Sequence, residues 1–148
     1  MICGAEFPRL TAANHRITSP ATTEYNCIAW CAGDIRHWWQ PGLFWPCPTP
    51  GDDFGIGVLE RAFIELGYVD CELNSSQEFG FEKVALYGSG AFYTHAARQL
   101  SNGAWTSKLG RDVDIEHETP DNVAGGTYGE VVQIMKRISE RTSQALPD

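Results

Sequence analysis

The chain has 148 residues, of which 43% are hydrophobic and 20% are charged, and this composition is typical of a globular protein. Such a length fits one domain and buries a core without disulfides or a structural metal, so we expect a single domain over residues 1–148. The net charge of −8, with Lys and Arg scattered along the chain, argues against a nucleic-acid partner.

The N-terminal segment is predicted to be irregular. Residues 1–21 contain Pro8 and Pro20, and no basic segment precedes an apolar stretch of the kind found in a signal peptide. No apolar run in the chain approaches the roughly 20 residues of a transmembrane helix. We therefore expect no membrane partner, and either a cytoplasmic location or secretion by a signal-free route.

A short helix is predicted over about residues 26–32, where a polar stretch ends at Asn26 and an apolar run begins at Cys27. The segment 38–50 then combines three Trp with four Pro, which excludes a helix or a central strand and predicts a loop. The aromatic side chains of this loop, Trp38 and Trp39 among them, are suited to cover the core, to wall a cleft beside Cys27, or to do both.

The rest of the core, which we expect at about residues 22–137, is predicted to contain one more helix and several strands. Residues 58–66 have the apolar periodicity of an amphipathic helix. Turn-forming residues separate three strand-like segments, which should form an antiparallel meander at residues 81–87, 92–100 and 105–108.

The last elements are less distinct. In residues 112–117 the alternation places Val113, Ile115 and His117 on one face, and Asp112, Asp114 and Glu116 on the other. Residues 128–138 suit either a helix or a closing strand, and the polar tail from Ser139 is expected to be frayed. The fold class that follows is α+β, with N-terminal helices packed on an antiparallel meander.

Cys27 is the candidate nucleophile, because backbone N–H groups at a helix N-terminus favour a thiolate and lower the pKa of a thiol. His95, in the strand 92–100, is the candidate base that takes the thiol proton. An oxyanion would be stabilised by the Cys27 N–H with a donor from Tyr25 or Asn26, although plain N-capping is the favoured role of Asn26. Nothing in the pattern calls for a cofactor.

A third group should fix the tautomer and the orientation of the His95 ring. Three polar residues follow His95 on the next strands: Ser107, Asp114 and His117. A hairpin that turns at Asn102 brings Ser107 roughly opposite His95. His117 is favoured, because it ends a strand on the apolar face and otherwise has no obvious partner. His15 and His37 are expected to be ordinary surface histidines.

Five cysteines, an odd number without a zinc-ribbon pattern, make a disulfide scaffold improbable. Cys31 lies one helical turn after Cys27 and is expected to be a small buried hydrophobe, although redox or metal pairing with Cys27 is conceivable. A cysteine before a histidine, with helices first and strands later, is the order of parts in a cysteine hydrolase.

The segment Asn26–Trp30, followed by Phe81–Tyr87 leading to Thr94–Leu100, resembles papain-like amidases and peptidases of the NlpC and CHAP kind. The chain more closely resembles an uncharacterised bacterial domain family with no established activity, over most of residues 22–137. The signature of that family is carried by Trp105–Gly110, Asp114–His117 and Tyr128–Gly129.

The papain-like resemblance implies a papain-like fold, a nucleophilic Cys27, a base His95 and a polar third residue. Asn26 stands where NlpC-like enzymes usually have Asp or Ser, and the Gly that commonly follows soon after the cysteine is absent. The implied substrates therefore extend beyond peptidoglycan to a protein, a peptide or a small amide.

Three hypotheses result. The first is a hydrolase or acyl transferase that works through an acyl-Cys27 intermediate. The second is a non-enzymatic binding module of the same fold that uses the Trp-rich loop at residues 38–45. The third and weakest is a zinc site at Cys27, His95 and His117, with water in the fourth position.

Overall fold

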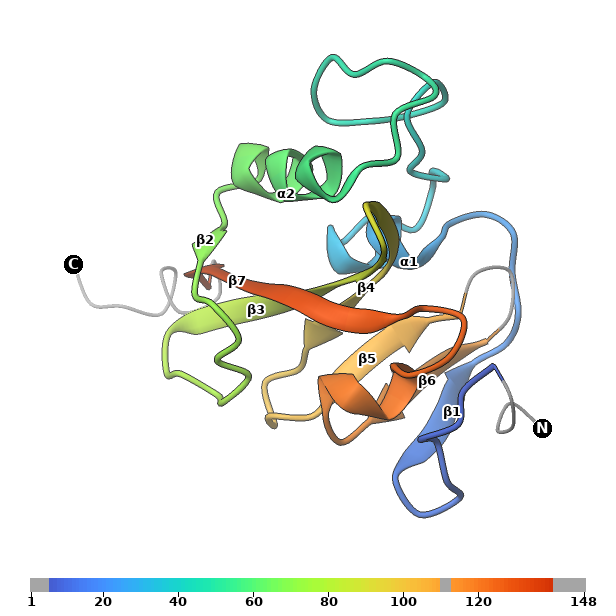
Figure 1. The fold of residues 1–148 in the computed structure, drawn as a ribbon. Helices are drawn as coiled ribbons and strands as arrows, with labels where there is room; N and C mark the ends of the chain where they lie inside the picture. The colour runs from blue at the N-terminus through green and yellow to red at the C-terminus, as the bar shows by residue number, and fades with distance from the viewer. Residues whose placement is uncertain (1–5, 110–112, 140–148) are drawn as a thin grey trace.

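The computed structural model describes residues 6–109 and 113–139. This part of the chain forms one seven-stranded sheet, two α-helices and a short 3-10 helix, so the α+β class is confirmed (Figure 1). In chain order the elements are β1 (His15–Ser19), α1 (Cys27–Cys31), α2 (Ile56–Glu65), β2 (Val69–Asp70), β3 (Phe81–Ser89), β4 (Phe92–Gln99), β5 (Trp105–Lys108), β6 (Asp114–His117), η1 (Pro120–Val123) and β7 (Glu130–Ile138).

The strands are ordered β1-β6-β5-β4-β3-β7-β2, and every neighbouring pair is antiparallel. The predicted meander is confirmed in β3 to β5, within one or two residues of its predicted limits, and β6 continues it. The irregular lead-in is wrong for His15–Ser19, because this segment pairs with β6 and places His15 opposite His117. The ambiguous last element is a strand, because the free edge of β3 supplies hydrogen-bond partners along β7.

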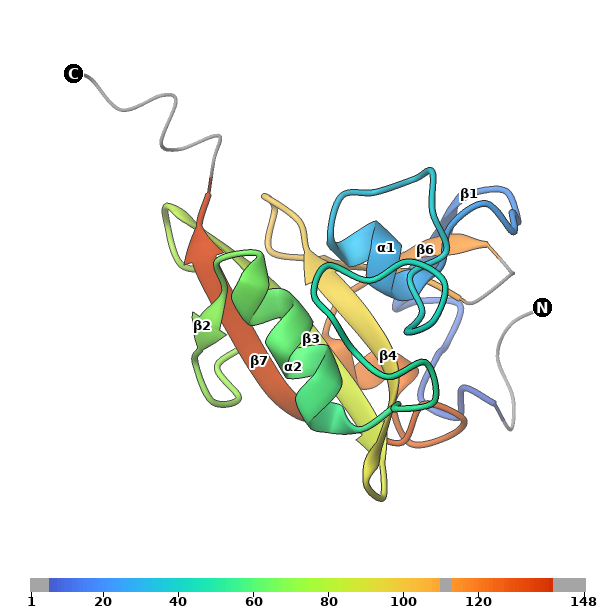
Figure 2. The same ribbon diagram turned by 90° about the horizontal axis from the view of Figure 1, so that it is seen from above.

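Two apolar clusters form the core, one on each face of the sheet. Val84 and Leu86 of β3 belong to the cluster that includes α1 and α2, whereas Ala85 and Tyr87 belong to the other. This division follows from the strand geometry, in which successive side chains point to opposite faces. Figures 1 and 2 show both helices on the same side of the sheet, with α2 above β3 and β7.

The helices form where the sequence indicates. The side chain of Asn26 caps α1, since its Oδ1 accepts from the Ala29 N–H at 3.1 Å. Gly33, with a φ of +83°, occupies the left-handed conformation that ends the helix. The helix α2 starts two residues before its predicted beginning and buries Val58, Leu59, Ala62 and Phe63, as its periodicity predicts.

Asp114 was placed on a polar face of its strand, but it is fully buried, because α1 and the residues before it cover that face of β6. Asp112, Cys3 and the tail at residues 140–148 lie outside the described residues. Within the described residues, no helix is both long and apolar enough to cross a membrane.

Candidate functional site

Cys27 is the first residue of α1 and lies at the edge of a cleft of about 250 Å³. Its side chain is 8% exposed. Asn26, Trp38 and Trp39, which the sequence pointed to, line the same cleft. Six lining residues were not singled out as site residues from the sequence: Ile28, Gln40, Phe54, Tyr93, Thr94 and Tyr128. The aromatic character of Phe54, Tyr93 and Tyr128 was visible in the sequence, but the convergence of the six residues on Cys27 was not.

Asn26 fixes the Trp-rich loop as well as the helix. Its Nδ2 donates to the Trp39 carbonyl at 2.8 Å, and its Oδ1 accepts from the Trp39 N–H at 3.2 Å. The Trp39 indole donates to Asp34 at 2.8 Å, which holds the ring against the core. The Asn26 amide is therefore held by capping and loop anchoring, which use its oxygen and one of its two N–H donors.

Tyr25 and Asp114 form a buried pair away from the cleft lining. The Tyr25 hydroxyl donates to Asp114 Oδ2 at 2.8 Å. Lys108, also fully buried, donates from Nζ to the Thr22 carbonyl at 2.9 Å and lies 5.5 Å from the centre of the Tyr25 ring. These groups support the chain that enters α1, and neither Tyr25 nor Asp114 lines the cleft.

The environment of Cys27 raises the pKa of its thiol to about 11. Burial is the main cause, and it is opposed by backbone N–H groups of Ala96, Ile28 and Cys27 itself, and by the charge of Lys108. The sequence predicted a lowered pKa from the helix N-terminus, and this prediction is wrong. A five-residue helix has too few aligned peptide dipoles to outweigh desolvation of the thiolate.

His95 belongs to a buried hydrogen-bonded chain on the face of the sheet opposite the helices. Its Nε2 lies 3.0 Å from Ser107 Oγ, which lies 2.7 Å from His117 Nε2. The chain ends where His117 Nδ1 lies 2.8 Å from the Thr119 carbonyl. The register places Ser107 diagonally between the two histidines, on the strand between theirs. His95 and Ser107 are fully buried, and His117 is 1% exposed.

The Thr119 carbonyl at the end of this hydrogen-bonded chain determines where each of its protons lies. A carbonyl only accepts, so His117 Nδ1 carries a proton and its Nε2 is an acceptor in the neutral ring. Ser107 then donates to His117 and accepts from the Nε2–H of His95. His95 Nδ1 is left unprotonated, and it has no hydrogen-bond partner among the described residues.

Burial keeps both rings neutral at pH 7. It lowers the pKa of His95 well below its usual 6.5, with a smaller contribution from His117. Burial likewise lowers the pKa of His117 to about 4, although the hydrogen bond to Thr119 opposes the shift. The favoured third residue, His117, therefore acts on His95 only through Ser107, and Ser107 is the direct partner.

Cys27 and His95 are neighbours through Ala96, but no hydrogen bond joins them among the described residues. Cys27 packs in the apolar cluster that contains Ala96, whereas His95 is paired with Tyr87, which belongs to the other cluster. Tyr128 connects the two regions: it lines the cleft and its ring stacks on that of His95, with centroids 3.9 Å apart. Sequence reasoning missed this stacking contact, although Tyr128 belongs to the quoted family signature.

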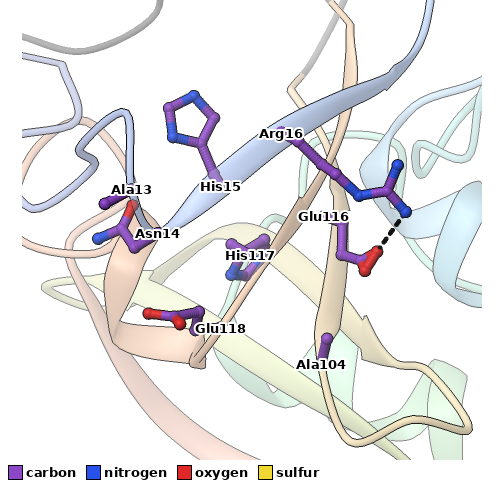
Figure 3. A pocket seen from close by; sticks show the side chains of 8 residues that line it. All are labelled: Ala13, Asn14, His15, Arg16, Ala104, Glu116, His117 and Glu118. Atoms are coloured by element: carbon purple, nitrogen blue, oxygen red, sulfur yellow. Dashed lines mark hydrogen bonds and ion pairs between the residues drawn. The ribbon is translucent and has the colours of Figure 1, made fainter.

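The remaining histidines do not join this site. His37 is exposed and contacts Asp34 at 2.8 Å. His15 lines a second cleft of about 200 Å³, which is formed by residues of the paired strands β1 and β6 and of the segments beside them, His117 included (Figure 3). Within the described residues, no three His, Cys, Asp or Glu side chains gather as metal ligands, so the zinc hypothesis has no support.

The other cysteines of the described residues are unpaired thiols. Cys31 is 1% exposed, as expected of a small buried hydrophobe, and no disulfide joins it to Cys27. Cys47 and Cys71 are partly buried and free. Cys27 is therefore distinguished from the other described cysteines by its place in the cleft.

Comparison with known protein families identifies the family of this chain. The family model described as a domain of unknown function, DUF7689, matches residues 16–136, which is most of the chain. No curated protein and no solved structure matches significantly.

Proposed function

The chain belongs to the DUF7689 family, and we propose that it is a cysteine hydrolase or acyl transferase that cleaves an amide or peptide bond, or a thioester. Cys27 is the nucleophile, and His95 is the base. The observation that carries the proposal is the assigned tautomer of His95. Its Nδ1 is unprotonated and has no hydrogen-bond partner within residues 6–109 and 113–139, and its buried ring is next in the chain to Ala96, which contacts Cys27.

The tautomer matters because a general base needs a free lone pair in a fixed direction. The chain from Thr119 through His117 and Ser107 holds a proton on His95 Nε2 and leaves Nδ1 as the only basic atom of the ring. Leaving such a nitrogen buried and unpaired costs about 1–3 kcal/mol, and a catalytic role is one reason for a protein to retain it.

The chemistry starts from a neutral thiol and a neutral imidazole. As the thiol attacks the carbonyl carbon, its proton passes to His95 Nδ1 and a C–S bond forms. The imidazolium then returns that proton to the leaving amine or thiolate as the C–N or C–S bond of the substrate breaks. Water, or an acceptor amine in a transferase, then gives a proton to Nδ1 and attacks the thioester carbonyl. The C–S bond to Cys27 breaks, Nδ1 returns the proton to Sγ, and the acyl group leaves as an acid or an amide.

Cys27 Sγ and His95 Nδ1 lie on opposite faces of β4, so proton transfer requires the strand to rearrange near Ala96 when substrate binds and to bring the two atoms together. Sγ already lies against the backbone of Ala96, the residue next to His95. Tyr128 lines the cleft and stacks on the imidazole, so a bound group that moves this ring also acts on His95. Catalytic hydrogen bonds are often long in the absence of substrate and shorten in the complex.

The proposal extends to a papain-like arrangement of these parts. Three features support it: the cysteine-bearing helix precedes strands β2 to β7 in the chain, the base is on β4, and the polar partner of the base is on β5. The substrates we propose are those that the sequence suggested: a protein, a peptide or a small amide.

Acylation of the protein by phenyl thioesters with neutral, anionic and cationic acyl groups tests the function. Intact-mass spectrometry should detect an acyl adduct on the wild type and on Cys31→Ala, and none on Cys27→Ala. Cys31→Ala is the matched control, since it removes a buried thiol of the same helix that does not line the cleft. The acylation rate should fall by about 10²–10⁴-fold in His95→Asn, because general-base catalysis is lost.

Two results would contradict the proposal. Failure of every thioester to acylate Cys27 would exclude the nucleophile. An equal rate in His95→Asn and the wild type, with both proteins folded by circular dichroism, would exclude the base.

A non-enzymatic binding module is the second candidate, and the raised thiol pKa favours it. A thiol with a pKa of about 11 is almost entirely protonated at pH 7, which suits a packing residue. In this case ligands of the aromatic cleft should stabilise Cys27→Ala as much as the wild type in thermal unfolding. Stabilisation that depends on the thiol would favour the enzyme instead.

A further inference from the structure

We propose that the cleft at Cys27 selects a small, uncharged acyl group with an aromatic or branched apolar side chain, and rejects acyl groups that carry a carboxylate. The identification of the bound group as an acyl group rests on the proposed function. The selectivity itself rests only on the lining, the volume and the charge of the cleft.

The described residues of the lining are mostly aromatic. Trp38, Trp39, Phe54, Tyr93 and Tyr128 supply the walls, and no Asp, Glu, Lys, Arg or His of the described residues belongs to them. Aromatic walls bind apolar groups and rings by burial and by stacked or edge-on contacts. A carboxylate that enters loses its hydration without meeting a cation, and this desolvation is unfavourable.

Charge outside the lining does not alter this conclusion. Lys108 lowers the pKa of Cys27, but its buried ammonium donates to the Thr22 carbonyl and does not line the cleft. The whole chain carries a formal charge of −8, which repels anions from the surface. An anionic acyl group is therefore disfavoured on approach as well as in the cleft.

The volume limits the size of the group. An apolar cavity of roughly 150 Å³ holds benzene, whereas sites for drug-sized ligands have roughly 300–1,000 Å³. At about 250 Å³, the cleft takes one ring or one branched chain together with the carbonyl group. It does not enclose several residues of a peptide, so recognition is of a single acyl unit.

One polar group of the lining is available to such a unit. Gln40 bonds Phe44 through its backbone, and its side-chain amide makes no hydrogen bond with another described residue. An amide is a neutral donor and acceptor, and it matches the amide bond of an uncharged substrate. The Asn26 amide, by contrast, already makes three hydrogen bonds that hold Trp39 and the helix.

Alkylation by three chloroacetamides tests the inference without requiring turnover. The reagents are 2-chloroacetamide, its N-benzyl derivative, and the N-benzyl derivative with a para-carboxylate, which share one electrophile. Peptide mass spectrometry at one pH gives the rate at Cys27 relative to that at Cys47, a partly buried free cysteine outside the cleft. The benzyl reagent should exceed chloroacetamide by about tenfold in this ratio, and the carboxylate should remove that gain.

Variants of Gln40 sharpen the test. Gln40→Glu places a carboxylate in the wall and should slow the para-carboxylate reagent further, while a para-aminomethyl reagent becomes faster. Gln77→Glu is the matched control, since it makes the same change of charge at an exposed position outside the cleft and should leave the ratios unchanged.

The outcomes separate this inference from the proposed function. Equal ratios for the neutral and anionic benzyl reagents, or no gain from the benzyl group, overturn the selectivity even if thioesters acylate Cys27 in a manner that depends on His95. The predicted ratios, together with acylation that is unaffected in His95→Asn, uphold the selectivity and refute the base.

Discussion

Replacement of Ser107 by Ala tests the assignment of protons that underlies the proposed base. The Ser107 hydroxyl accepts from His95 Nε2 at 3.0 Å and donates to His117 Nε2 at 2.7 Å. Its removal leaves two buried nitrogens without partners, at about 1–3 kcal/mol each. We therefore expect a loss of about 2–6 kcal/mol in the free energy of unfolding, a large part of the ~5–15 kcal/mol typical of a domain.

The same substitution should release the tautomer of His95. Without an acceptor at Nε2, its proton is free to move to Nδ1, and the basic nitrogen is lost. Acylation of Cys27 should then be slower by about 10²–10⁴-fold, the contribution of a general base. Ser101→Ala, at an exposed serine in the turn after β4, is the matched control and should change stability by no more than ~0.5 kcal/mol.

Urea unfolding measures the first effect, and nitrogen-15 imidazole spectra measure the second. In the wild type, Nδ1 of His95 should give the signal of an unprotonated ring nitrogen, assigned by its disappearance in His95→Asn. A proton on Nδ1 of the wild-type ring would refute the tautomer argument. So would an unchanged acylation rate in Ser107→Ala.

Three further predictions concern titration. The pKa of the Cys27 thiol is about 11 in the folded protein, whereas an ordinary cysteine has a pKa of 9.0. The rate of its alkylation by iodoacetamide should therefore still increase above pH 9. A plateau of that rate below pH 9 would show that the thiol is not desolvated. Lys108→Met removes a positive charge that lowers the pKa of Cys27, so the dependence of the alkylation rate on pH should move to higher pH. A shift to lower pH would contradict the electrostatic role of the lysine. The pKa of His117 is about 4 in the folded protein and 6.5 ordinarily, so the unfolded chain binds the proton first as the pH falls. The free energy of unfolding should therefore decrease between about pH 6.5 and pH 4, by up to about 3 kcal/mol. Urea titrations of the wild type and His117→Gln should show a smaller decrease in the variant, and parallel curves would exclude the buried neutral ring.

Several elements could be predicted because their signals are local. The polar cap before an apolar run located α1, and the period of 3.6 residues located α2. Alternation and turn residues located β3 to β5, and the hairpin at Asn102 brought Ser107 within reach of His95. These properties depend on residues close in sequence, so they persist in any fold that the chain adopts.

Other features depended on residues far apart in the sequence. The strand β1 exists because β6, about 100 residues later, offers it a free edge, and β7 is a strand because β3 does the same. The periodicity of residues 128–138 could not distinguish a helix from a strand. The edge of β3 decided the outcome, because unpaired backbone groups beside a buried strand are unfavourable.

The sequence by itself determined that Cys27 begins a helix beside an aromatic loop, and that a histidine, a serine and a second histidine follow on successive strands. Only the tertiary structure decided the state of these groups. It raised the pKa of Cys27, although the helix N-terminus predicted the opposite, and it placed Ser107 between His95 and His117. The physical reason is that desolvation and proton position depend on what surrounds a group in three dimensions, and the sequence specifies those surroundings only through the complete fold.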